Sequence, residues 1–199
     1  MPDTFLTQLA RPRPDPGGGA AAAYAARVAV ALLLKVAHLE APRSRPGPGS
    51  PEVWEEILKE AERLAHRFRQ LQDEDVEAYR GFARARAAGS GLLQAVRAAT
   101  RCPLNIMNCA LATLELAGRA GALCQPHLLS DLLVAVELLG GALQGAYHIA
   151  SANLPWFEAV SERRNTAATL VRARDLGEAA LWTVRLDLMA RPGPSGGTP

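Results

Sequence analysis

The chain has 199 residues, of which 49% are hydrophobic and 5% aromatic, and its formal net charge is +2. This length suits one domain with a substantial core, whereas two full domains would be cramped. The small net charge creates no overall field that would attract nucleic acid or an acidic membrane, and no basic run is interleaved with aromatic residues. We therefore expect no nucleic-acid partner, a single domain over residues 1–190, and a disordered Pro- and Gly-rich tail over residues 191–199.

Long stretches rich in Ala, Leu, Glu and Arg, without sustained alternation of period two, predict an all-α protein. A Pro- and Gly-rich loop over residues 42–51 separates the first two long helices, and Gly89-Ser90-Gly91 ends the second. We expect a short helix after it and a new helix start at Cys102-Pro103, because proline suits the first turn of a helix. The result is a bundle of about six helices. Their expected ranges are 20–39, 51–86, a short helix between 92 and 101, 102–118, one that starts between 126 and 130 and ends at 150, and 156–189.

The first helix is apolar enough to raise the question of a membrane span. Arg27, Lys35 and His38 interrupt it, however, and fall with Tyr24 on one side of a helix. A membrane-spanning helix would expose these charges to lipid at a high cost in free energy. We therefore expect a helix of a soluble protein that is buried on most sides.

The cysteines and histidines indicate neither a disulfide framework nor a metal centre. Cys102, Cys109 and Cys124 are odd in number and stand in apolar sequence, which is typical of reduced, buried thiols in a cytoplasmic protein. No charged segment precedes an apolar run at the N-terminus, so we expect no signal peptide. Cys124 and His127 could ligate a metal, but no second pair stands at a useful spacing.

Three consecutive glycines, Gly17, Gly18 and Gly19, come directly before the first long helix. Glycines cost backbone entropy and add no side-chain packing. In front of a helix they let the chain turn sharply and leave the first N–H groups open to a polar ligand. A flexible linker is the alternative interpretation. The sequence Gly-Lys-Ser/Thr of a nucleotide-binding loop does not follow them, so we expect no nucleotide cofactor.

The second helix carries one carboxylate on its apolar side. At about 100° per residue, Asp75 lies roughly 20° from Phe68 in helical projection, whereas the other acidic residues of segment 73–77 point away. A carboxylate in that position must find partners or acquire a raised pKa, which makes Asp75 a candidate general acid or base. A structural aspartate bound by an arginine or by backbone N–H groups is the alternative. The apolar side comprises Trp54, Ile57, Ala61, Leu64, Phe68, Leu71, Tyr79 and Phe82.

The chain resembles the formiminotetrahydrofolate cyclodeaminase / methenyltetrahydrofolate cyclohydrolase family, a helical family that acts on folate-bound one-carbon units. The specific parts of the resemblance are Pro14-Asp15-Pro16-Gly17-Gly18-Gly19 before the helix and the acidic segment Asp73-Glu74-Asp75-Val76-Glu77-Ala78-Tyr79. Softer matches extend the resemblance from Phe5 to the final helix. These are Pro103-Leu104, Ser130-Asp131, Gly145-Ala146-Tyr147 and Asn153-Leu154.

The resemblance implies that Asp75 is the catalytic residue and that a tetrahydrofolate derivative is the substrate. It further implies that Gly17, Gly18 and Gly19 bind this substrate, together with Ser130, Asp131 and Asn153. The residues themselves allow local roles as well: Ser130 and Asp131 could cap and stabilise the start of a helix, and Asn153 could belong to a proline turn.

The chain also departs from the family pattern. Ala20 stands where the family has Ser, Asn108 where it has Glu, Cys124-Gln125 where it has Gly-Asn, and Ile149 where it has Asn. Two functions therefore stay open: a folate-dependent cyclodeaminase or cyclohydrolase, and a non-catalytic helical protein that retains the family fold.

The wide apolar helix faces predict a symmetric homodimer, for which Gly140, Gly141 and Gly145 would allow a close approach of backbones. Core packing within one chain is the alternative interpretation of these three glycines.

Overall fold

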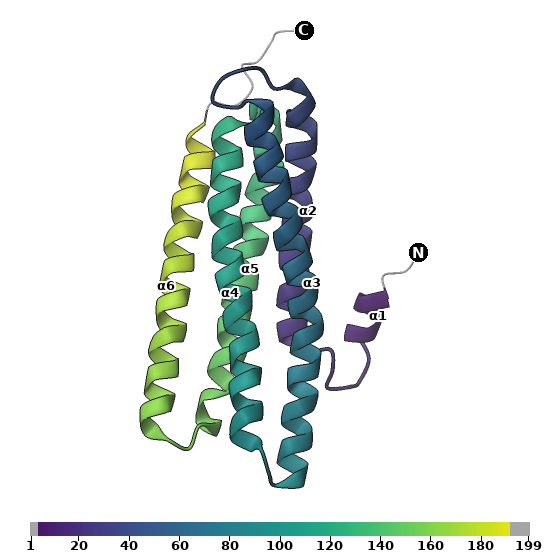
Figure 1. Ribbon diagram of the computed structural model, residues 1–199, viewed down its shortest axis with the longest axis vertical. Coiled ribbons are helices and arrows are strands. Elements are labelled where there is room, and N and C mark those ends of the chain that lie inside the picture. Colours follow the sequence, from purple (N-terminus) through teal and green to yellow (C-terminus); the bar gives the residue numbers. More distant parts are fainter. Residues whose placement is uncertain (1–3, 192–199) are drawn as a thin grey trace.

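Five long helices run nearly parallel and alternate in direction along the length of the molecule (Figure 1). A computed structural model describes residues 4–191. Within this range every regular element is helical, so the all-α prediction is confirmed. Short 3-10 turns at Ala41–Arg43, Pro126–Leu128 and Leu154–Trp156 lie in three of the connections. The α-helices are α1 (Thr4–Leu9), α2 (Gly18–Glu40), α3 (Pro51–Ala88), α4 (Leu92–Leu123), α5 (Leu129–Ala152) and α6 (Val160–Ala190).

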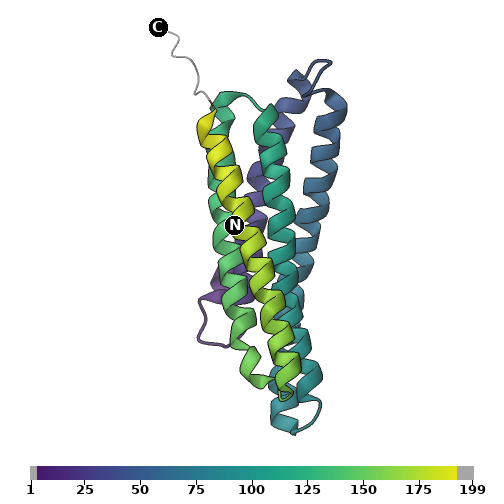
Figure 2. The ribbon, with the colours of Figure 1, turned by 90° about the vertical axis from the view of Figure 1, so that its left-hand side faces the viewer.

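Helices α2 to α5 form a four-helix arrangement, and α6 packs against α4 and α5. Figure 2 shows this layering from the side on which α6 faces the viewer. The short helix α1 stands beside the bundle (Figure 1) and buries none of its residues, although Phe5 stacks on Tyr24 with ring centroids 4.7 Å apart. The largest side chains of the core include Leu33, Trp54, Phe68, Ile106, Leu132 and Leu143.

The apolar side of α3 is buried only over its first part. The predicted stripe from Trp54 to Leu71 is buried, but Tyr79, which belongs to the same stripe, is 40% exposed. The reason is the start of α2 at Gly18, since α3 continues past that level and has no part of α2 to cover it. The sequence predicted the stripe correctly and its burial only as far as Leu71.

The predicted helix start at Pro103 is wrong, because Pro103 lies inside α4, which is continuous from Leu92 to Leu123. Proline inside a helix removes one donor and leaves the carbonyl four residues earlier without its helical partner. That carbonyl belongs to Ala99, and it accepts a hydrogen bond of 3.0 Å from Nδ2 of Asn153. A tertiary contact that the local pattern does not reveal therefore compensates for the lost donor.

The predicted end of this helix near Gly118 is also wrong. A Cβ at Gly118 would lie 3.1 Å from Cγ2 of Val184, and one at Gly121 would overlap the side chain of Leu188. Both side chains belong to α6. These glycines let α6 approach α4 closely and do not end the helix.

Two of the three glycines considered for a dimer contact serve packing within the chain. A Cβ at Gly140 would lie 2.8 Å from Cδ2 of Leu181 on α6, and one at Gly145 would lie 3.7 Å from Cβ of Ala22 on α2. Of these three glycines, Gly141 is the one at which an added Cβ would have no described atom within 4 Å. Core packing therefore accounts for Gly140 and Gly145.

Residues 18–43 and 126–156, which contain α2 and α5, are long and apolar enough to span a membrane by length and composition. These two helices pack against each other, and half of each apolar window is buried inside the bundle. The end of the chain was predicted to be disordered from residue 191. Nη1 of Arg191 donates a hydrogen bond of 2.8 Å to the Cys124 carbonyl, while residues 192–199 lie outside the described part.

Candidate functional site

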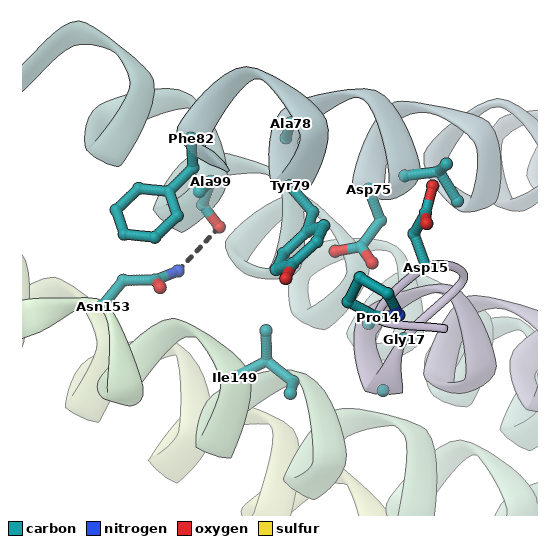
Figure 3. A pocket seen from close by; sticks show the side chains of 13 residues that line it. Pro14, Asp15, Gly17, Asp75, Ala78, Tyr79, Phe82, Ala99, Ile149 and Asn153 are labelled. Atoms are coloured by element: carbon teal, nitrogen blue, oxygen red, sulfur yellow. Dashed lines mark hydrogen bonds between the residues drawn. The ribbon is translucent and has the colours of Figure 1, made fainter. Parts of the chain in front are cut away.

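A pocket of about 250 Å³ lies at the end of the bundle where α2 begins and α5 ends. It adjoins the part of α3 that α2 does not cover. In Figure 3, Asp75 and Tyr79 project into it from α3, and Ile149 faces them from α5. The residues that line it are Pro14, Asp15, Gly17, Gly18, Gly19, Asp75, Val76, Ala78, Tyr79, Phe82, Ala99, Ile149 and Asn153.

The Asp75 carboxylate binds the N-terminus of α2. Its Oδ2 accepts a hydrogen bond of 2.8 Å from the backbone N–H of Ala20, in the first turn of that helix. The N-cap residue Gly17 has no side chain to supply this contact, so an aspartate from α3 satisfies one of the open N–H groups. The partial positive charge of the helix start favours a carboxylate at this position.

The absence of a side chain at Gly19 makes this contact possible. A Cβ at Gly19 would overlap the carboxylate oxygens of Asp75 and lie 2.5 Å from its Cγ. A Cβ at Gly17, by contrast, would meet only the Pro14 carbonyl oxygen, at 3.6 Å. The glycine segment is therefore more than a flexible linker, because Gly19 provides the space that the Asp75 carboxylate occupies.

Burial raises the pKa of Asp75 above its ordinary value, and the hydrogen bond from Ala20 lowers it by a smaller amount. Desolvation disfavours the charged carboxylate, which accounts for the direction of the net change. Near Asp75, burial and the negative charge of this residue raise the pKa of Cys102 to about 12. A thiol in this state is a poor nucleophile at neutral pH, so Asp75 is the better candidate for chemistry in this region.

The segment before the glycines is tied to α3 by an ion pair at the edge of the pocket. Asp15 lines the pocket, and its Oδ2 accepts a hydrogen bond of 2.5 Å from Nε of Arg80. Nη1 of Arg80 also donates to Glu77, at 2.8 Å. This pairing holds the chain over residues 14–17 beside the pocket.

Aromatic side chains form one wall of the pocket. Tyr79 and Phe82 line it, and the Phe82 ring meets Trp156 edge-on with ring centroids 5.2 Å apart. The guanidinium of Arg86 lies 5.2 Å from the centroid of Trp156. The site thus combines one sequestered carboxylate with an apolar and aromatic surface, as expected of a pocket for a planar organic ligand.

The structure brings together five of the residues that the sequence singled out for a site. Asp75 and Asn153 line the same pocket as the three glycines 17–19. Ser130 and Asp131 lie at the opposite end of α5, because the 22 residues from Asp131 to Asn153 span roughly 33 Å along a helix. There, Oδ2 of Asp131 accepts a hydrogen bond of 2.8 Å from Nζ of Lys35.

A capping role for Ser130 is wrong. Helix α5 already begins at Leu129, its N-cap residue is Leu128, and no side chain caps it. Ser130 itself is exposed. The 3-10 turn directly before Leu129 continues into the helix and removes the need for a capping side chain.

The four departures from the family pattern occupy different surroundings. Ile149 lines the pocket, and Ala20 supplies the N–H that binds Asp75. Asn108 is exposed on α4, and the backbone N–H of Gln125 donates to Glu40 at 3.3 Å, far along the bundle from the pocket. Only two of the four positions therefore touch the candidate site within one chain.

Sequence reasoning assigned Tyr79 and Phe82 to the core and did not identify Asp15 as a pocket residue. Tyr79 follows Asp75 by one helical turn, and this spacing could have indicated a shared site. The role of Asp15 could not be found in this way, since its partner Arg80 is 65 positions away. Within residues 4–191, no group of three or more His, Cys, Asp or Glu residues could hold a metal ion.

The fold is an all-helical bundle. Its candidate site holds the Asp75 carboxylate against the start of α2, where Gly19 leaves the space for it. The chain belongs to the formiminotransferase-cyclodeaminase family, whose model matches residues 2–170. The crystal structure of formiminotetrahydrofolate cyclodeaminase from Thermotoga maritima superimposes with a TM-score of 0.85 at 23% sequence identity, covering 93% of each chain. This likeness shows a common fold. No curated protein matches the chain.

Proposed function

We propose that the protein is a folate one-carbon enzyme of the formiminotetrahydrofolate cyclodeaminase or methenyltetrahydrofolate cyclohydrolase type, with Asp75 as its general acid and base. The observation that carries this proposal is the position of Asp75, a carboxyl group with a raised pKa inside a pocket with an aromatic wall. Family membership and the solved cyclodeaminase of the same fold support the class of substrate.

Both reactions pass through a tetrahedral carbon between two nitrogens, so one proton-shuttling carboxyl group could serve either. In the cyclodeaminase reaction, N10 of 5-formiminotetrahydrofolate attacks the carbon of the protonated formimino group. N10 then loses its proton, and the formimino nitrogen accepts one proton and leaves as ammonia. In the cyclohydrolase reaction, water adds to the methenyl carbon and loses a proton. The C–N5 bond then breaks as N5 is protonated, and the remaining hydroxyl proton is released to solvent as the formyl C=O forms. Asp75 would take up the first proton and deliver the second.

The pocket can take part of such a ligand. Its volume of about 250 Å³ is below the roughly 300–1,000 Å³ of typical ligand sites, so a ring system fits better than a whole extended folate. The pterin ring would lie against Tyr79, with Asn153 and the glycine segment as further contacts. No metal or nucleotide cofactor is needed for either reaction as written.

Near-UV absorbance of 5,10-methenyltetrahydrofolate tests the proposal. A cyclohydrolase accelerates the loss of this absorbance, whereas a cyclodeaminase generates it from 5-formiminotetrahydrofolate with release of ammonia. Asp75→Asn should lower the turnover by a factor of about 100 or more and keep the fold and the folate-dependent rise in melting temperature. Full activity of this variant would contradict the role of Asp75.

The second candidate function is that of a non-catalytic helical protein that retains the family fold, and Ile149 favours it. This side chain lines the pocket where the family has Asn, so the wall opposite Asp75 presents no hydrogen-bonding group at this position. Absence of turnover of either folate, together with no change in melting temperature on adding them, would support this second candidate.

We further propose a cytoplasmic homodimer that forms through the outer face of α2 and α5. Val28 and Val134 are 41% and 52% exposed on this face, and Gly141 leaves space for a close approach. The pair Lys35–Asp131 is the ion pair that crosses it. Exposed apolar surface on the two most apolar helices is typical of a subunit interface.

Light scattering of Val134→Arg tests this surface, because a charge there should shift the protein from dimer to monomer. Leu186→Arg is the matched control, since Leu186 is 59% exposed on α6, away from this face. Equal behaviour of the two variants would contradict the assignment of the interface.

A further inference from the structure

The side-chain amide of Asn153 is bound to a carbonyl that lies four residues before a proline on another helix. Its Nδ2 donates a hydrogen bond of 3.0 Å to the carbonyl oxygen of Ala99, drawn as a dashed line in Figure 3. Ala99 lies four residues before Pro103 inside α4. This carbonyl would bind the N–H of residue 103 in a regular helix, and proline has no such N–H.

The bond determines which atom of the amide the pocket can use. A side-chain amide has one acceptor oxygen and an NH2 group with two N–H donors. Because one N–H of Asn153 is bound to the Ala99 carbonyl, the nitrogen is directed toward α4 and the oxygen lies on the other side of the amide, where it can face a ligand. The position is further constrained by the backbone, since the Asn153 N–H donates to Ala150 and its carbonyl accepts from Trp156, at 3.2 and 3.1 Å.

We propose that Pro103 is a positioning residue, which leaves the Ala99 carbonyl available and thereby orients the Asn153 amide with its oxygen toward the ligand. Pro103 is buried in α4 and does not line the pocket. The consequence for ligand chemistry is that Asn153 accepts a hydrogen bond, so it selects an N–H group of the ligand. The ligand is the folate pterin ring if the proposed function holds, and this part of the proposal rests on that function.

A double-mutant cycle in thermal unfolding tests the positioning without any folate. Asn153→Ala should lower the melting temperature by about 3 °C or more, since it leaves a partly buried carbonyl without a donor. In the Pro103→Ala background the same change should have less than half this effect, because the N–H of residue 103 can then bind Ala99. Equal losses in the two backgrounds would overturn the proposal.

Steady-state kinetics with 5,10-methenyltetrahydrofolate or 5-formiminotetrahydrofolate test the consequence for the ligand. Pro103→Ala should raise KM at least threefold with kcat within about twofold and with no fall in melting temperature. A purely structural proline would change the melting temperature and leave KM unaltered, and that result would overturn the role in ligand orientation. Pro126→Ala, the same change at the opposite end of the bundle, is the control and should leave KM unchanged.

The two experiments separate this proposal from the proposed function. If the unchanged protein turns over neither folate, the proposed function fails, and the melting cycle alone decides whether Pro103 orients Asn153. If turnover is present and the cycle is additive, the function stands and the positioning fails.

Discussion

Each end of α5 carries a polar residue that matches the family pattern, but one of them is in an exposed ion pair and the other lies in a pocket. At its start, Asp131 is paired with Lys35 in an exposed ion pair. At its end, Asn153 lies in a pocket beside Asp75, whose pKa burial raises. Exposed ion pairs contribute little to stability. A residue that matches a family motif therefore becomes a candidate for chemistry only where packing of the helices excludes water from it.

The largest effect should come from the pocket end. Asp75→Asn should lower kcat for the folate reaction by a factor of about 100 to 10,000, the range that loss of a general acid or base produces. The variant keeps the size of the side chain, and its amide oxygen can still accept the Ala20 N–H, so the far-UV circular dichroism should not change. A loss of kcat below threefold in a stopped-flow absorbance assay would mean that the pocket end of α5 is no more important for catalysis than its other end.

The next effect concerns the glycine segment. Gly19→Ala places a Cβ against the Asp75 carboxylate, so this side chain must leave the start of α2. We expect at least a tenfold loss of activity and a destabilisation of about 1–3 kcal/mol, measured by urea unfolding. Gly17→Ala is the matched control for stability, because its Cβ makes an ordinary contact with Pro14. Equal destabilisation by the two changes would show that the loss of glycine's backbone freedom is responsible, and the overlap with Asp75 is not.

A third effect should appear in stability as a function of pH. The folded state raises the pKa of Asp75, so the folded protein binds the proton more tightly than the unfolded chain. Stability from this group is therefore present at low pH and decreases as the pH rises through the folded pKa. The melting temperature of Asp75→Asn should equal or exceed that of the original protein at pH 8, and its advantage should shrink on acidification. An advantage that grows on acidification would mean that the native pocket stabilises the charged carboxylate.

The smallest effect is expected at the start of α5. Asp131→Asn removes an exposed ion pair, so the free energy of unfolding should change by less than about 1 kcal/mol and kcat/KM by less than twofold. A loss of activity above tenfold would instead indicate that Asp131 reaches a site on a second copy. Analysis of the same variant by light scattering distinguishes that case from a change in assembly.

Several features of the fold could be predicted from local patterns. The apolar periodicity of α3 identified its buried side up to Leu71, and the Pro- and Gly-rich loop marked the boundary between α2 and α3. The break predicted at Pro103 failed because a side chain 54 positions from the carbonyl that proline leaves open binds that carbonyl. The end predicted near Gly118 failed because glycine there makes room for another helix. Local patterns report local preferences, and neither partner was local.

The sequence by itself determined that the chain is helical, which family it resembles, and that Asp75 projects from the apolar side of its helix, because helical periodicity and a short motif are properties of neighbouring residues. Only the tertiary structure decided that Asp75 binds the start of α2 and that Gly19 makes room for it, since these contacts join positions more than fifty apart. It also decided that Asn153 shares the pocket, whereas Asp131 pairs with Lys35 at the other end. Burial and distance arise from packing between helices, and the order of residues along one helix does not contain them.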